Sequence, residues 1–340
     1  MHKKHILIGG GGIAGLSAAL AFNAQGHEVV LCEQHAAGED VGAGIQISPN
    51  GMKVLRGLGL EQEALLRGVQ PQGLEMRLGQ AKAERVIFNA KLGKQSVARW
   101  GAPYLHIHRA DIIDILANAL AQRAPNALRY NTAIKSYTNL PDTIGITLAD
   151  GRQLEGDMLV GADGLYSIIR AQMLGADKPR FTGNMAWRAV VPAPKETKII
   201  PPIPKTACVW VGARRHAVTY YLRGGELINF VGVVERDSAS NEFVGDELWM
   251  KQGKTADMLA DFDGWNPTLR QLIEQIIEQD IAVFQWPLYD RAPVSRWHDG
   301  RAILIGDAAH PALPFMAQGA NMALEDSFLL ARLADMLAHD

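Results

Sequence analysis

Hydrophobic and polar positions alternate in blocks along the first part of the chain. An apolar run at 5–9 leads into a glycine cluster, an apolar helical stretch at 13–25 and a second apolar run at 28–32. The order strand, turn, helix, strand is typical of a βαβ unit, whose two strands lie in one parallel sheet. The sequence therefore predicts an α/β domain that begins at the N-terminus.

Further segments with helical or buried-strand patterns follow this unit. They are a helix within 47–60 that starts at a proline, an amphipathic helix at 109–123, a buried strand and turn at 157–164, another at 301–310, and a final helix at about 319–338. The apolar residues of 109–123 recur at the three-to-four-residue spacing of one helix face. We expect these segments to complete the α/β domain.

The pattern changes between about 180 and 235, where short β-type runs are separated by Gly, Pro and Arg. Such spacing predicts an antiparallel sheet. The proline-rich stretch 192–205 suits a connection or an edge and not a central strand. Helical patterns return at 255–278, so a β-rich unit interrupts the α/β domain, which resumes late in the chain.

Composition narrows the class of protein. In 340 residues, 48% hydrophobic and 21% charged content is ordinary for a globular chain, and a net charge of -2 without charged blocks argues against nucleic-acid binding or a polybasic membrane anchor. Cys32 and Cys208 are too few for a disulfide framework, and Cys32 lies in an apolar run that suits a buried free thiol. No apolar stretch approaches the ~20 residues of a membrane span. We expect a cytoplasmic enzyme without stable membrane association.

The glycine cluster carries the first chemical signal. Gly10, Gly12 and Gly15 form G-x-G-x-x-G between a strand and a helix, which allows a tight turn, close approach of a pyrophosphate and close helix–strand packing. The helix N-terminus offers free N–H groups to phosphates. Glu33 ends the second strand, where an acid should hold a ribose diol. The fingerprint predicts a dinucleotide ligand and leaves NAD and FAD open.

Four later motifs, in order, resemble those of the flavoprotein aromatic hydroxylases, the group A FAD-dependent monooxygenases. They are GAGIQISPN at 42–50, HRADI at 108–112, GADGLYSIIR at 161–170, and LIGDAAHPALPFMAQGANMALED at 304–326. The third matches at Asp163, Gly164, Ser167 and Arg170, and the AQGANMALED wording resembles the salicylate hydroxylase-like branch. The resemblance covers nearly the whole chain and implies FAD as the cofactor.

The fingerprint and the resemblance together indicate the cofactor-binding residues. These are Gly10, Gly12, Ile13, Ala14, Gly15, Glu33, Gln34, Gln46, Arg109, Asp163, Asp307, Gly319, Ala320 and Asn321. Asp307, at the end of a buried strand, either accepts ribitol hydroxyls or caps a helix. The N–H groups that open the final helix can face the pyrimidine edge of the flavin, whose negative charge on reduction the helix dipole favours. We interpret His310 as a structural residue, and Pro314 either as a rigid element at the flavin or as a turn proline.

The resemblance also implies a fold and a domain division. We expect an α/β, Rossmann-like FAD-binding domain with an inserted antiparallel β-rich substrate domain and a late-returning final helix. The FAD-binding domain would comprise 1–70, 100–180 and 280–340, and the substrate domain 71–99 and 181–279. Relatives continue past the final helix, so we expect either a short member or a truncated chain.

The activity that the resemblance implies is hydroxylation of a small phenolic or heteroaromatic acid through a flavin hydroperoxide. NADH or NADPH would reduce the FAD as a transient co-substrate, because the sequence has no second G-x-G-x-x-G. Substrate, O2 and NAD(P)H are then the partners, and the protein is expected to be a monomer or homodimer. Water must be excluded for the oxygen transfer to succeed.

His216 and Tyr220 are the predicted catalytic residues. Four residues apart on one predicted strand, they point to the same face with backbones roughly 13 Å apart, so their side chains can bracket a small ring. Branch members similar to this chain use a His and a Tyr at this spacing. The alternative is an exposed cross-strand pair. Arg188 either meets a substrate carboxylate or, as we expect, forms a surface or inter-domain ion pair.

Other features refine these expectations. The pair His106 and His108 lacks a third ligand at metal spacing, so no metal site is predicted. Gln46 stands where some hydroxynicotinate-type members carry histidine, and Pro314 where some hydroxybenzoate-type members carry a polar residue. Both departures leave the substrate open.

Two alternative functions remain at this point. One is another FAD oxidoreductase of the same fold, of the halogenase or dehydrogenase type, although MAWRAVVP at 185–192 lacks the second tryptophan of the halogenase signature W-x-W-x-I-P. The other is a non-catalytic FAD-binding sensor. The presence of His216 and Tyr220 on the substrate sheet favours the monooxygenase.

Overall fold

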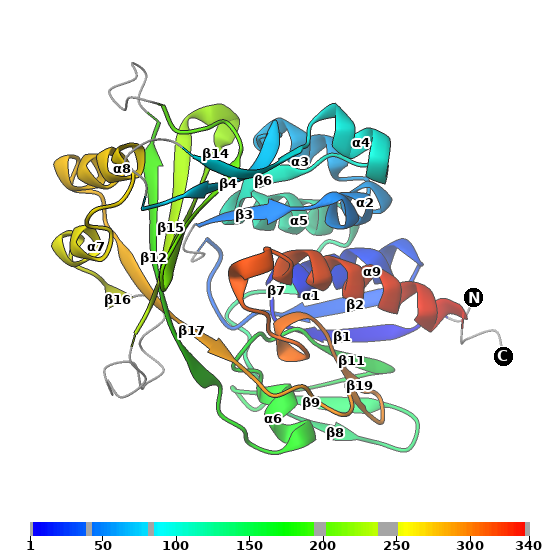
Figure 1. Ribbon diagram of the computed structural model, residues 1–340. Helices are drawn as coiled ribbons and strands as arrows, with labels where there is room; N and C mark the ends of the chain where they lie inside the picture. Colours follow the sequence, from blue (N-terminus) through cyan, green and yellow to red (C-terminus); the bar gives the residue numbers. More distant parts are fainter. Residues whose placement is uncertain (1–2, 39–42, 81–84, 194–201, 237–250, 337–340) are drawn as a thin grey trace.

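The computed structural model describes residues 3–38, 43–80, 85–193, 202–236 and 251–336. Two large sheets stand side by side, with helices between and around them (Figure 1). One is six-stranded and belongs to the α/β part of the chain. The other is eight-stranded and lies across one side of it.

The six-stranded sheet has the order β18-β19-β11-β1-β2-β7. Its strands are β1 (His5–Gly9), β2 (Glu28–Cys32), β7 (Leu128–Arg129), β11 (Met158–Gly161), β18 (His298–Asp299) and β19 (Ala302–Leu304). β1 pairs in parallel with both β2 and β11, as the predicted βαβ unit requires. Cys32 and Cys208 are both buried and free, as expected for Cys32.

Helices cover this sheet and connect it to the second one. They are α1 (Ile13–Ala24), α2 (Pro49–Gly57), α3 (Glu61–Arg67), α4 (Lys94–Trp100), α5 (Arg109–Arg123), α6 (Ile168–Leu174) and α9 (Gly319–Met336). Ten consecutive residues of α1 are buried, because α5 and α9 pack against it. The Oγ of Ser327 on α9 donates to the carbonyl of Ala14 at 2.8 Å, so the last helix is anchored on the first.

The eight-stranded sheet has the order β16-β17-β12-β15-β14-β13-β4-β5. Its strands are β4 (Gly73–Leu78), β5 (Val86–Lys91), β12 (Arg180–Pro192), β13 (Ala207–Gly212), β14 (Arg215–Leu222), β15 (Leu227–Glu235), β16 (Lys251–Gln252) and β17 (Phe284–Asp290). Neighbouring strands are antiparallel, except that β13 runs parallel to β4. The predicted antiparallel sheet is therefore present with one parallel pair.

The two faces of this sheet have different neighbours (Figure 1). The helices α7 (Thr255–Asp261) and α8 (Pro267–Glu278) cover the outer face over a core that includes Trp187, Trp210 and Phe230. On the opposite face, Ala186 and Val233 belong to a small cluster that Leu313, from the segment before α9, joins. That inner face is therefore directed at the α/β part of the chain.

Two smaller sheets complete the fold. One contains β8 (Ile134–Asn139), β9 (Ile144–Leu148) and β10 (Gln153–Gly156), and the other contains β3 (Gly44–Ile47) and β6 (Leu105–His108). The pair β3 and β6 lies between the two large sheets, which places the residues after β2 and before α5 next to each other.

The structure confirms the α/β class, the β-rich second part and the late-returning helix, and it changes several details. The helical pattern at 255–278 is two helices, separated where Gly264 adopts a positive φ and Asn266 caps α8 by accepting the N–H of Thr268 at 3.0 Å. β17 pairs with β12, so a strand within the span 280–340, which we assigned to the FAD-binding domain, lies in the eight-stranded sheet. Most of the stretch 192–205 lies outside the described residues.

Candidate active site

The glycine turn between β1 and α1 has the geometry of a phosphate cradle. Gly10 has a φ of 102°, and a Cβ there would lie 2.4 Å from the carbonyl oxygen of Ala162. A Cβ on Gly15 would lie 1.9 Å from the carbonyl oxygen of Gly10, whereas one on Gly12 would meet nothing within 4 Å. Gly10 and Gly15 are thus required by packing, and Gly12 faces open space where a phosphate can approach the first turn of α1.

Glu33 stands beside this turn, as predicted. Its carboxylate accepts the N–H of Gly11 at 2.5 Å and that of His35 at 2.8 Å. These contacts fix the carboxylate next to the glycine turn, and its oxygens retain acceptor capacity for a ribose hydroxyl. Gln34 is exposed at the end of β2, while Ile13 and Ala14 are buried in the first turn of α1 and face the core, with their N–H groups at the helix terminus.

Asp163 lies at the same edge of the six-stranded sheet, directly after β11. Its carboxylate accepts the hydroxyl of Ser167 at 2.5 Å and the N–H of Ile169 at 3.1 Å, and Ser167 caps α6. Burial raises the pKa of Asp163, and these hydrogen bonds oppose that effect. The side chain therefore holds the start of α6, and its backbone flanks Gly10.

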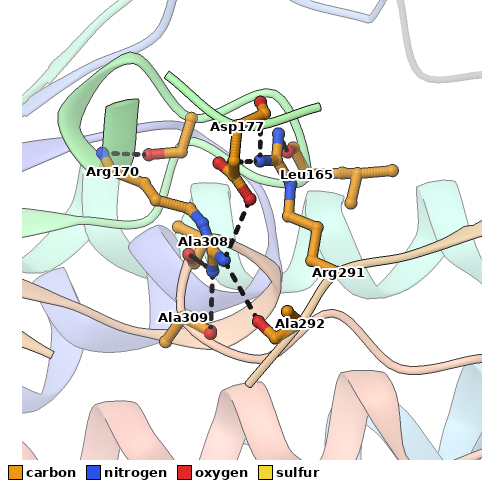
Figure 2. Close-up of polar contacts among 8 residues, drawn as sticks. Leu165, Arg170, Asp177, Arg291, Ala292, Ala308 and Ala309 are labelled. Atoms are coloured by element: carbon orange, nitrogen blue, oxygen red, sulfur yellow. Dashed lines mark hydrogen bonds and ion pairs between the residues drawn. The ribbon is translucent and has the colours of Figure 1, made fainter. Parts of the chain in front are cut away.

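Arg170 connects this turn to the segment that carries Asp307 (Figure 2). Its buried guanidinium donates to the carbonyls of Ala308 and Ala309, both at 3.1 Å, and forms an ion pair with Asp177 at 3.4 Å. Arg291 also pairs with Asp177 and donates to the carbonyl of Leu165 at 2.6 Å. Arg170 thus sets the position of the turn that follows β19, and Arg291 holds Asp177, the ion-pair partner of Arg170.

Asp307 lies near both the first turn of α1 and the start of α9. A Cβ on Gly306 would lie 3.0 Å from the Cβ of Ala14, and one on Gly319 would lie 3.9 Å from the Oδ1 of Asp307. The surrounding protein raises the pKa of Asp307 by desolvation, although solvent reaches its carboxylate, and the charges of Arg109 and His310 oppose this shift. Arg109, at the start of α5, therefore lies within electrostatic reach of Asp307.

The side chain of Asn321 fastens β3 to the start of α9. Its Oδ1 accepts the N–H of Ser48 at 2.9 Å, and its Nδ2 donates to the carbonyl of Gln46 at 3.1 Å. The Gln46 side chain in turn accepts the hydroxyl of Tyr104 at 2.7 Å. The N–H groups of the first turn of α9, at 319–321, have no acceptor within the helix and stay suited to bind an anionic edge.

His216 and Tyr220 lie on the inner face of the eight-stranded sheet, on β14. The imidazole of His216 lies 5.5 Å from the ring of Phe315, which comes from the segment between Asp307 and α9. The ring of Tyr220 lies 4.4 Å from that of His106 on β6. The two predicted catalytic residues therefore face the same space as the predicted cofactor residues, and are not an exposed pair.

Burial sets the protonation of both side chains. It lowers the pKa of His216, so the imidazole is neutral near pH 7 and can accept a proton. It raises the pKa of Tyr220, an effect that Arg188 opposes, so the phenol stays protonated and can donate a hydrogen bond. This is one proton acceptor and one donor on a single sheet face.

The sequence did not indicate Tyr104, Phe315 or Asn229. The Oδ1 of Asn229 accepts the N–H of Gly44 at 2.7 Å, and a Cβ on Gly44 would lie 2.7 Å from the Tyr220 ring. Each contact joins segments far apart in sequence, so only the fold reveals it. Gly44, within the GAGIQISPN motif, was the sequence feature that could have indicated a close contact here.

His106 packs with the aromatic rings of Tyr104 and Tyr220. It is fully buried between Tyr104 and Tyr220, and burial lowers its pKa to about 3. Among the residues that the structure describes, no group of three His, Cys, Asp or Glu side chains is arranged to hold a metal ion.

A separate apolar cavity of about 600 Å³ lies behind Tyr104, lined also by Leu74, Trp100 and Phe328. None of the predicted site residues lines it. The described helices include none that is both long and apolar enough to cross a bilayer.

The glycine turn, the acidic residue after β2 and the α9 terminus define a dinucleotide-binding oxidoreductase whose second sheet lies beside the α/β part of the chain. The model of the FAD binding domain family matches residues 3–339. The chain therefore belongs to this family, and the cofactor is FAD. The open space at Gly12 and the N–H groups of α1 and α9 fit its pyrophosphate and its ring edge.

Curated relatives define the class of enzyme. The chain is 36% identical over 334 residues to 6-hydroxynicotinate 3-monooxygenase of Bordetella bronchiseptica, covering 97% of this chain and 82% of that protein. It is 35% identical over 334 residues to 3-hydroxybenzoate 6-hydroxylase 1 of Aquipseudomonas alcaligenes, covering 97% and 80%. The chain is an FAD-dependent aromatic-ring monooxygenase by this relationship, which sets aside the halogenase, dehydrogenase and sensor alternatives.

Solved structures agree on the fold. A salicylate hydroxylase in complex with its substrate shares 25% identity with a TM-score of 0.80, covering 97% of this chain and 79% of that one. Klebsiella pneumoniae HpxO with FAD and uric acid shares 24% identity with a TM-score of 0.82, at the same coverages.

Proposed function

We propose that this protein hydroxylates a small aromatic acid that carries a ring hydroxyl, with NADH or NADPH as the reductant. The observation that carries the proposal is the placement of a neutral His216 and a protonated Tyr220 opposite the predicted FAD residues. When bound and reduced, FAD supplies the oxygen atom, from O2, that the ring acquires.

The side chains of the site would prepare the substrate for this transfer. An imidazole nitrogen of His216 accepts the proton of the ring hydroxyl, which makes the ring electron-rich. The hydroxyl of Tyr220 donates a hydrogen bond that orients the substrate. Val218 lies between them on β14, and the ring of Phe315 contacts that of His216, so both add apolar surface beside the site.

The test is the substitution His216→Ala. Removal of a general base lowers the rate of product formation by ~10²–10⁴-fold. The yellow spectrum and the amount of bound FAD should stay unchanged, because no predicted cofactor residue is altered. The measurements are hydroxylated product by chromatography and NAD(P)H oxidation, with 3-hydroxybenzoate, 4-hydroxybenzoate and 6-hydroxynicotinate as a panel.

His298→Ala is the matched control, since His298 is an exposed histidine at the edge of the six-stranded sheet. Its activity should equal that of the wild type. A His216→Ala variant that forms product at the wild-type rate would show that His216 is not the base.

A further inference from the structure

Arg188, in the middle of β12, points to the inner face of the eight-stranded sheet. Its chain neighbours Trp187 and Ala189 belong to the core beneath α8, so alternation directs Arg188 toward the cofactor side. Its Cζ lies 3.9 Å from the centroid of the Trp286 ring. Arg188 also lines, with Ala43 and Phe284, a cavity of about 250 Å³.

No acidic partner for this guanidinium is found among the residues that the structure describes. Its Nε is buried without a hydrogen-bond acceptor. Burial lowers the pKa of Arg188 to about 10. Among the described residues, Tyr220 opposes this shift and Arg109, a second cation, adds to it. The ion pair that we expected for Arg188 is thus not present in the described structure.

A desolvated cation beside another cation is unfavourable until an anion binds there. The planar guanidinium is suited to a carboxylate, which it can bind through two parallel hydrogen bonds. Stacking on Trp286 fixes its plane in advance, which reduces the entropy lost when the anion binds. The site is therefore prepared for a carboxylate.

We propose that Arg188 is a specificity-determining residue that binds the carboxylate of the aromatic acid, an inference that rests on the proposed function. Arg188 pairs in register with Val231, which pairs with Val218, the residue between His216 and Tyr220. Two strand spacings, roughly 10 Å, separate Arg188 from the centre of the catalytic pair. An aromatic acid between them presents its carboxylate to Arg188 and its hydroxyl to His216.

Two other anions are available in the holoenzyme. The pyrophosphate of FAD belongs at the open glycine turn before α1, in a different part of the fold. The reduced flavin ring carries negative charge, and Arg109 is the predicted flavin contact near Arg188. The experiment must therefore separate a substrate carboxylate from the flavin ring.

The test compares Arg188→Gln and Arg188→Lys with the wild-type holoenzyme. Perturbation of the FAD spectrum, without NAD(P)H, measures the Kd of each panel acid and of its uncharged amide. We expect Arg188→Gln to raise the Kd of the acid by ~10–100-fold, because a hydrogen-bonded charge is lost. The Kd of the amide should change less than ~2-fold, and Arg188→Lys should restore part of the affinity for the acid. KM should rise more than kcat falls.

Arg180→Gln is the matched control, because Arg180 lies on the same strand but is exposed and paired with Asp290. It should leave every value unchanged. The proposal is overturned, and Arg188 is assigned to the flavin, by either of two results. One is an equal rise in the Kd of the acid and of the amide. The other is a changed FAD affinity or flavin midpoint potential while the Kd of the acid stays the same. If Arg188→Gln hydroxylates the panel acids with the rate and KM of the wild type, this inference alone is refuted. If the wild-type protein hydroxylates no panel member, the proposed function is refuted as well.

Discussion

At the scale of single residues, His310 shows how the turn after β19 is held. Its Nε2 lies 2.5 Å from the Oδ2 of Asp326 on α9, and the same oxygen accepts the N–H of Gly306 at 2.9 Å. The hydrogen bond to Asp326 raises the pKa of His310 above the ordinary 6.5, although burial opposes it. The pair therefore stabilises the fold fully below pH 6.5, and this contribution is lost as pH rises through the raised pKa.

Asp326→Asn tests this pair, since asparagine keeps an acceptor for Gly306 but loses the charge. Between about pH 6 and pH 9, the wild-type free energy of unfolding should fall by ~1–2 kcal/mol more than that of the variant. Urea unfolding at a series of pH values measures both. If the free energies of unfolding of the two proteins change with pH by the same amount, Asp326 does not stabilise the protonated form of His310.

At the scale of elements, two glycines in the turn from β1 to α1 have different roles, one in packing and the other in ligand binding. Gly12 and Gly15 belong to one fingerprint, but only Gly15 is closed in by backbone, because its Cβ would overlap the Gly10 carbonyl. Gly12→Ala should cost the apoprotein no more than ~1 kcal/mol, as expected for alanine at an N-cap. It should raise the Kd for FAD at least ~10-fold, because the methyl group occupies the approach of the pyrophosphate.

Gly15→Ala is the comparison, and there the apoprotein itself should lose ~3 kcal/mol or more by overpacking. Apoprotein unfolding and fluorescence titration with FAD measure the two quantities separately. A Gly12→Ala protein that binds FAD as tightly as the wild type would place the pyrophosphate elsewhere.

The difference between local contacts and contacts far apart in sequence explains what the sequence could predict. The span 109–123 matched α5 because its apolar spacing is local, and the fingerprint glycines act within one turn. The place of β17 beside β12, and that of His106 between Tyr104 and Tyr220, depend on partners far along the chain. Arg188 shows the limit best, since only the fold reveals whether an acid lies nearby.

At the scale of the whole molecule, the ion pair between Arg223 and Asp111 joins the two large parts of the structure. Arg223, in the turn between β14 and β15, donates from Nε and Nη2 to the carboxylate of Asp111 on α5, at 3.0 and 2.7 Å. Asp111 is only 11% exposed, whereas Arg223 is 46% exposed. α5 begins at Arg109 and β14 carries His216, so this contact fixes the predicted flavin contact relative to the predicted base.

Arg223→Ala should therefore lower both the stability of the fold and the fraction of NAD(P)H oxidation that yields hydroxylated product. Loss of a partner for a buried carboxylate costs ~1–2 kcal/mol here, between the values for exposed and buried pairs. More of the NAD(P)H consumed should yield peroxide instead of product, because a looser contact between the parts admits water. Arg214→Ala is matched to it, since Arg214 also has a positive φ in a turn but pairs with Glu235 at the surface. If both variants couple NAD(P)H oxidation to hydroxylation equally well, the Asp111 pair stabilises the fold without aligning the site. If only Arg223→Ala loses hydroxylated product to peroxide, the eight-stranded sheet and α5 must be held in position for oxygen transfer.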